Sequence, residues 1–184
     1  MGGGVSRVVA GATVGRWAAF FAIAAVVVVI DQATKAYVVA GYPLGEPVQV
    51  IGDWVRIWYI QNAGALFGLF QQQALLFGLV SIAVVGVIVW LHGKTSGSGG
   101  WLATAGLGLL LGGAIGNMID RFRFGYVVDF VDIGIGDWRF FTFNVADACI
   151  DIGIVVLILL AFLPALGERF GGTRSAAPHG EAER

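Results

Sequence analysis

Residues 74–91 read ALLFGLVSIAVVGVIVWL, a run without a charged side chain. At about 1.5 Å of rise per residue, a helix of this length nearly crosses the ~30 Å hydrocarbon core of a bilayer. In the whole chain, apolar residues make up 58% and charged residues 12%, far from the usual composition of a soluble domain. The sequence therefore predicts an integral membrane protein that crosses the lipid as helices.

Three other apolar segments bring the predicted spans to four; they cover about residues 17–39, 101–119 and 147–166. The first is long enough only if it continues past Asp31, which puts a carboxylate inside the membrane near one face. Lys35 follows one turn later on the same side, and we expect its ammonium group to extend toward water. We predict a single all-α membrane domain over residues 1–184, with a disordered tail over about residues 168–184.

The third span carries Gly108, Gly112 and Gly116 at intervals of four residues. This spacing is typical of helices that approach each other closely, because glycine leaves room for a neighbouring backbone. We therefore expect a tight helix contact near the polar end of this span.

Charge and cysteine content exclude several kinds of partner and bond. The net charge of −1 does not indicate a nucleic-acid partner, and there is no long run of like charge. The single cysteine, Cys149, permits no intramolecular disulfide. It lies two residues from Asp147 and points away from it around the helix, so we interpret Cys149 as structural.

Two short boxes of one form, Asn117‑Met‑Ile‑Asp120 and Asn144‑Val‑Ala‑Asp147, lie where the third span ends and the fourth begins. If the chain crosses four times, both boxes share one membrane face with Asp31 and with the loop that contains Asn62. The two histidines then fall on the other face. The sequence therefore predicts that carboxylates and amides converge at one end of the bundle, without histidine.

Two carboxylates held close together share a proton, so that one acts as a base while the other acts as an acid. Such a pair can activate water for peptide hydrolysis, as in aspartic peptidases. Three alternatives stay open at this point. The aspartates can lie simply at the water interface, serve a small transporter or ion relay, or hold Mg²⁺ or Ca²⁺ with carboxylates alone.

The cations are divided almost evenly between the two membrane faces, so the positive-inside bias is weak. It favours cytoplasmic termini if the loop-side cations are committed to acidic partners nearby. Candidate partners are Glu46, Asp53, Asp129, Asp132 and Asp137. On this interpretation the polar end of the bundle lies on the external face.

Five blocks of the sequence resemble, in order and spacing, the signature blocks of the lipoprotein signal peptidase family, also called signal peptidase II. They are Asp31‑Gln‑Ala‑Thr‑Lys35, Asn62‑Ala‑Gly‑Ala‑Leu‑Phe67, Gly116‑Asn‑Met‑Ile‑Asp‑Arg121, Val128‑Asp‑Phe130 and Phe143‑Asn‑Val‑Ala‑Asp147. The resemblance extends over roughly residues 17–166. It implies a bacterial four-helix aspartic endopeptidase that removes the signal peptide from prolipoproteins, cutting before a diacylglyceryl-modified cysteine.

The resemblance also assigns roles. It makes Asp120 and Asp147 the catalytic pair, with no metal or cofactor. It makes a further set of residues site-supporting or substrate-binding: Asp31, Lys35, Asn62, Asn117, Arg121, Asn144 and Ala146. It implies a small β-cradle over about residues 48–60 and a short surface helix over 64–73, both in the first external loop.

By the same resemblance, the protein lies in the bacterial cytoplasmic membrane, with both termini cytoplasmic and the active site external. Its partners are lipid-modified prolipoproteins, membrane lipids and globomycin-type inhibitors. Two residues depart from the family pattern, Leu66 and Asp151. We interpret Asp151 as a buried, protonated structural group, with participation in the site as the alternative.

Overall fold

The computed structural model describes residues 3–63, 73–95 and 100–163. Within these residues, four long helices confirm the predicted four-helix fold: α1 (Gly3–Gly41), α2 (Ala74–Thr95), α3 (Trp101–Phe124) and α4 (Val145–Phe162). Each contains an apolar window long enough to cross a membrane. The third helix continues past residue 119, the predicted end of its span, so Asp120 and Arg121 lie within its final turns.

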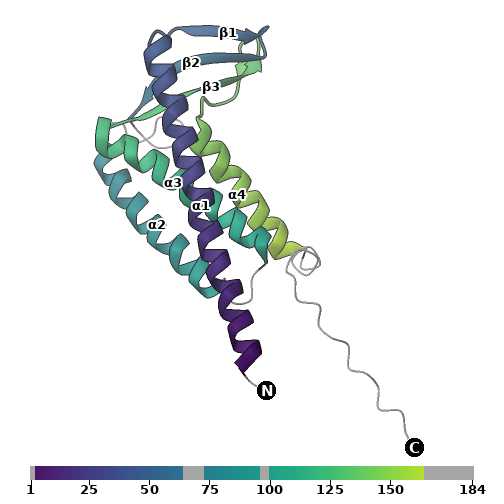
Figure 1. Ribbon diagram of the computed structural model, residues 1–184. Helices are drawn as coiled ribbons and strands as arrows, with labels where there is room; N and C mark the ends of the chain where they lie inside the picture. The colour runs from purple at the N-terminus through teal and green to yellow at the C-terminus, as the bar shows by residue number, and fades with distance from the viewer. Residues whose placement is uncertain (1–2, 64–72, 96–99, 164–184) are drawn as a thin grey trace, which may run out of the picture.

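A four-stranded antiparallel sheet lies across one end of the helices, opposite the start of α1 and the end of α4 (Figure 1). Its strands, in order, are β1 (Pro47–Ile51), β2 (Val55–Asn62), β3 (Val127–Ile135) and β4 (Trp138–Arg139). The first two confirm the predicted cradle. The strands β3 and β4 were not predicted, although β-branched and aromatic residues dominate β3, as is usual in strands.

The central helix is α3, which packs against the other three helices. A Cβ atom on Gly112 would lie 2.6 Å from Cβ of Val27, and one on Gly108 would lie 3.0 Å from Cβ of Ile23. Glycine is therefore required where α1 crosses α3, which confirms the predicted tight contact. On the side of α4, Gly153 faces the carbonyl oxygen of Gly106, where a Cβ would approach to 2.8 Å.

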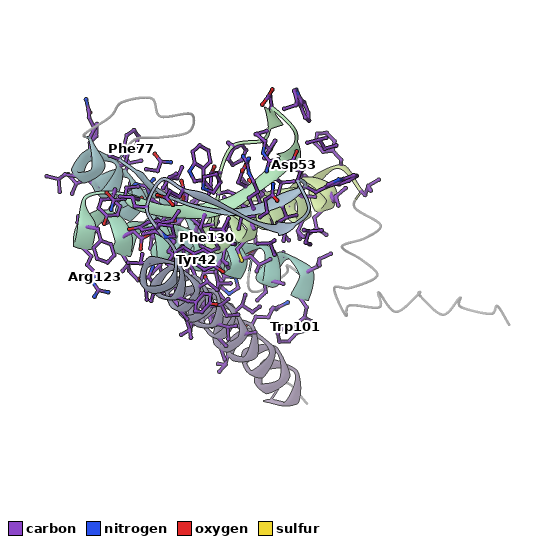
Figure 2. The ribbon with its side chains drawn as sticks, turned by 90° about the horizontal axis from the view of Figure 1, so that it is seen from above. Tyr42, Asp53, Phe77, Trp101, Arg123 and Phe130 are labelled. Carbon is purple, nitrogen blue, oxygen red and sulfur yellow. The ribbon has the colours of Figure 1, made fainter. Side chains whose placement is uncertain are left out.

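A small apolar cluster attaches the sheet to the bundle. It contains Val38 near the end of α1, Tyr59 from β2, and Val128 and Phe130 from β3. Tyr42 packs against this cluster, and Figure 2 shows it beside Phe130 where the sheet meets the end of α1. This contact holds β3 directly above the polar ends of α3 and α4.

Two predictions concern residues that the structure does not describe. The surface helix expected over residues 64–73, including Leu66, falls almost entirely within 64–72, and the expected disordered tail falls within 164–184. Both lie outside the described residues.

Candidate active site

A buried cation organises the polar end of the bundle. The ammonium group of Lys35 lies 2.9 Å from Oδ2 of Asp31 and 2.9 Å from Oδ2 of Asp120. It also donates a hydrogen bond of 2.9 Å to Oδ1 of Asn117. Lys35 is only 3% exposed, so the expectation that it extends toward water is wrong. Two carboxylates and an amide replace its hydration, which a buried charge requires.

Asp31 connects α1 to the start of α4. Its Oδ1 accepts a hydrogen bond of 2.9 Å from the backbone N–H of Ala146, which is fully buried. A Cβ atom on Gly116 would lie 2.6 Å from Oδ2 of Asp31, so α3 also needs glycine here. Through these contacts the Asp31 carboxylate links α1 to α3 and to the start of α4.

Asp120 is buried beneath β3, with both carboxylate oxygens in use. Oδ1 accepts from Nε2 of Gln32 at 2.9 Å, and Oδ2 accepts from the backbone N–H of Val128 at 3.1 Å. The ion pair with Lys35 completes its surroundings. A carboxylate that forms an ion pair with a buried ammonium group is poorly suited to exchange protons with water, so these contacts do not favour the catalytic role predicted for Asp120.

Asp147 belongs to a capping box at the start of α4. The side chain of Asn144 accepts from the backbone N–H of Asp147 at 3.0 Å, and Oδ2 of Asp147 accepts from the backbone N–H of Asn144 at 3.1 Å. The second Asn‑x‑x‑Asp box is thus the N-cap of α4. Oδ1 of Asp147 accepts from Nδ2 of Asn117 at 2.8 Å. Asp147 is half-buried.

Asp129 on β3 is the third carboxylate at this end of the bundle. Its Oδ1 accepts from Nδ2 of Asn144 at 2.6 Å, and its Oδ2 accepts from Nδ2 of Asn62 at 2.9 Å. Burial, followed by the negative charge of Asp147, raises the pKa of Asp129 to about 7. Asn144 therefore contacts both carboxylates, through its backbone N–H to Asp147 and through its side chain to Asp129.

Residues 23–163 of this chain match the family model described as signal peptidase (SPase) II. The chain belongs to the signal peptidase II family. Two relatives are lipoprotein signal peptidases: one from Halothermothrix orenii, 38% identical over 76% of this chain and 92% of the relative, and one from Geobacillus kaustophilus, 40% identical over 82% and 97%. A solved bacterial membrane enzyme superposes with a TM-score of 0.70 at 29% identity, covering 82% of this chain and 90% of the other.

The match identifies the protein as a bacterial multi-pass membrane signal peptidase. In this peptidase the predicted polar residues lie close together at one end of the bundle. Direct hydrogen bonds and ion pairs join these residues into one network. Its members are Asp31, Lys35, Asn62, Asn117, Asp120, Asp129, Asn144, Ala146 and Asp147. Arg121 borders this network. Its Nη1 donates to the carbonyl oxygen of Asn117 at 3.3 Å, and its guanidinium lies 6.0 Å from the ring centre of Phe77.

Sequence reasoning missed Asp129 as a site residue. The block Val128‑Asp‑Phe130 is part of the family resemblance, but the charge pattern places Asp129 among the acidic residues that neutralise nearby cations. The signal in the sequence is an acidic residue within the apolar run Val127‑Val‑Asp‑Phe‑Val131, where the strand buries four consecutive residues, Val127 to Phe130.

The loop-side cations of the peptidase are partly committed, as predicted. Arg56 donates to Oδ2 of Asp132 at 2.6 Å, and Nη2 of Arg139 lies 3.0 Å from the same oxygen. Arg139 also donates to the carbonyl oxygen of Asp53, at the end of the sheet far from Phe77 (Figure 2). Because these loop cations are ion-paired, they count less when the positive charges on the two membrane faces are compared.

A carboxylate relay would require polar groups that continue from the site toward the other membrane face. Below the site, the buried core of α1 and α3 is instead apolar: Phe20, Ala24, Leu107, Leu111 and Ala114. This core separates the site from Arg16 and His92 at the far end of the bundle. The arrangement does not favour the alternative of a transporter or ion relay.

Asp151 departs from its predicted environment, because it is exposed on α4 and not buried. The helix buries Ala146 and Gly153 against α3, and Asp151 lies off that face. The interpretation of Asp151 as a buried structural group is therefore wrong.

Proposed function

We propose that this chain is an aspartic endopeptidase that removes the signal peptide from diacylglyceryl-modified prolipoproteins by cleavage before the lipidated cysteine. The substrate class follows from relatives whose names describe lipoprotein signal peptidases. One observation carries the aspartic mechanism: Asn144 holds two carboxylates, those of Asp129 and Asp147, at the same end of the bundle.

In this proposal Asp129 takes the place of Asp120 in the catalytic pair. Because the pKa of Asp129 is raised to about 7, we assign to Asp129 the proton that the pair shares below that pH, and to Asp147 the role of the base. Asp147 removes a proton from water as the water oxygen attacks the scissile carbonyl carbon. Asp129 donates its proton to the carbonyl oxygen, which gives a tetrahedral intermediate with two hydroxyl groups. As the C–N bond breaks, Asp147 passes its proton to the leaving amide nitrogen, and one hydroxyl group of the intermediate returns its proton to Asp129 as the C=O bond forms again.

Asp120 has a positioning role in this scheme. It accepts a hydrogen bond from the N–H of Val128, the residue directly before Asp129, while Lys35 holds it against α1. Asp120 thereby fixes the height of β3 above α3 and with it the position of the Asp129 carboxylate.

The amides orient the two reacting carboxylates. Asn117 donates to Asp147, and its own oxygen is fixed by Lys35, so the carboxamide can present only one orientation. Asn62 and Asn144 both donate to Asp129 and reduce the cost of its ionised form. Arg121 lies within electrostatic range of all three aspartates and is suited to bind a carbonyl oxygen of the substrate.

The proposal includes cytoplasmic termini and an active site on the external face. The weak positive-inside bias supports this orientation, because Arg56 and Arg139 on the site face are ion-paired. By family resemblance, globomycin-type inhibitors bind the same site.

The test of this function uses purified protein in detergent with a diacylglyceryl-modified prolipoprotein. We expect release of the signal peptide, and we expect the rate to be unchanged by excess chelator, because carboxylates and water suffice for the reaction. The unmodified prolipoprotein serves as the control substrate and should stay intact. Loss of activity on chelation would revive the carboxylate-only metal site, and equal cleavage of both substrates would refute the proposed lipid requirement.

The pH dependence tests which aspartate carries the proton. Because Asp129 must be protonated, kcat/KM should fall as the pH rises through about 7. This fall is the alkaline limb of the pH profile of kcat/KM. Asn62→Ala removes a hydrogen bond that favours the ionised carboxylate, so the pKa of Asp129 rises and the alkaline limb should move to higher pH.

Gln61→Ala is the matched control for this shift. Gln61 precedes Asn62 on the same strand but donates to the hydroxyl groups of Tyr59 and Tyr126. Its replacement should leave the alkaline limb in place. A limb that stays fixed or moves to lower pH in Asn62→Ala would contradict the assignment of the proton to Asp129.

A further inference from the structure

Asp151 is a carboxylate inside a membrane span that the reaction as described does not use. It lies four residues after Asp147 in α4, in a window of high hydropathy, and its side chain is exposed. Within the described part of the chain no hydrogen bond or ion pair to it is found. An acidic side chain in such a position is energetically unfavourable, so its presence points to a function.

The contacts of α4 define the side on which Asp151 lies. Ala146 and Gly153 face α3, and Cys149 is within electrostatic range of Asp31 on α1. At about 100° of rotation per residue, Asp147 and Asp151 lie on the flank of α4 that turns away from α1. This flank, with Ile154 and Ile158 exposed farther along it, is called the Asp147 flank below.

Asp151 lies about 6 Å deeper in the membrane than Asp147, since four residues of helix separate them. The signal peptide of a bound substrate extends from the scissile bond into the membrane. At about 3.3 Å per residue, an extended signal peptide reaches the depth of Asp151 about two residues before the scissile bond. At about 1.5 Å per residue, a helical signal peptide reaches it about four residues before that bond. Apart from Asp151, the exposed Asp147 flank is apolar along this depth.

We propose that Asp151 is a specificity determinant that accepts a hydrogen bond from a hydroxyl-bearing side chain of the signal peptide, two to four residues before the scissile bond. The inference rests on the proposed function. In lipid a carboxylate has few other hydrogen-bond partners. A hydrogen bond from a hydroxyl group to it therefore contributes more binding free energy than the same bond would in water. A site that contains such an acceptor discriminates against an apolar isostere, which leaves the acceptor without a partner.

The test compares substrates that carry Thr or Val, which have nearly the same shape, at the second, third and fourth residue before the scissile bond. We expect the wild-type enzyme to prefer Thr at one of these positions by about tenfold in kcat/KM, the effect of one hydrogen bond. In Asp151→Leu the preference should vanish or reverse. Asp151→Asn, which keeps an acceptor oxygen, should retain part of it.

A relocation variant provides the matched control. Asp151→Leu combined with Ile152→Asp keeps a carboxylate in α4 but moves it about 100° around the helix, off the Asp147 flank. This variant should not regain the preference for Thr.

Three outcomes separate the two proposals. If the wild type cleaves no substrate, the proposed function fails. If it cleaves Thr and Val substrates equally, or if the relocation variant restores the preference, the role of Asp151 is overturned while the peptidase assignment stands. Unfolding temperatures of all variants exclude a general loss of structure.

Discussion

Asp129→Asn is expected to lower kcat/KM for signal-peptide release by about 10³-fold, and Asp147→Asn by a similar factor. The amide has nearly the shape of the carboxyl group but cannot transfer a proton to the carbonyl oxygen. The fold should survive, because burial already disfavours the charge that Asp129→Asn removes. The measurement is the initial rate of signal-peptide release from the lipid-modified substrate.

Stability distinguishes Asp129 from Asp120. The raised pKa of Asp129 means that the folded protein loses stability as the pH rises from about 4 to about 7, where this group ionises. Asp129→Asn should therefore be at least as stable as the parent at pH 8. Asp120→Asn removes a partner of Lys35, so it should unfold more readily.

Two results would restore the pair assigned by family resemblance. One is full activity of Asp129→Asn. The other is an inactive Asp120→Asn whose unfolding temperature equals that of the parent.

Lys35→Met is expected to reduce the free energy of unfolding by about 3–5 kcal/mol. Methionine fills a similar volume, but it leaves the carboxylates of Asp31 and Asp120 buried without their shared cation. The same change removes the hydrogen bond that orients Asn117, so the activity of the remaining folded protein should fall as well. Denaturant titration in mixed micelles measures the stability change.

Two variants control for the loss of a lysine. Lys94→Met removes an exposed cation at the end of α2 and should change stability by less than about 0.5 kcal/mol. Adding Asp31→Asn and Asp120→Asn to Lys35→Met removes the whole buried charge set and should restore much of the lost stability. A Lys35→Met protein as stable as its parent would show that this network does not hold the helices together.

The four spans could be predicted because their cause is local. A long apolar run must form a helix in lipid, where each backbone N–H and C=O needs a partner within its own segment. Counting crossings then predicted that Asp31, Asn117 and Asp147 meet at one end. The hydrogen bonds among these residues and their neighbours fulfil that expectation.

The choice among the aspartates depended on contacts that no local pattern contains. Asp120 is withdrawn from solvent because β3 folds back over α3 and Lys35 reaches it from α1, 85 residues earlier in the chain. Asp129 gains its raised pKa only because the same fold-back buries it beside Asp147.

The sequence by itself determined the membrane class, the four helices, the family and the end of the bundle at which the polar residues gather. Those features follow from hydropathy, helix geometry and motif spacing, all of which act along the chain. Only the tertiary structure decided which carboxylates are ion-paired, which share an asparagine, and that Asp151 is exposed. Burial and charge pairing set the chemistry of a carboxyl group, and both are produced by segments that are distant in sequence.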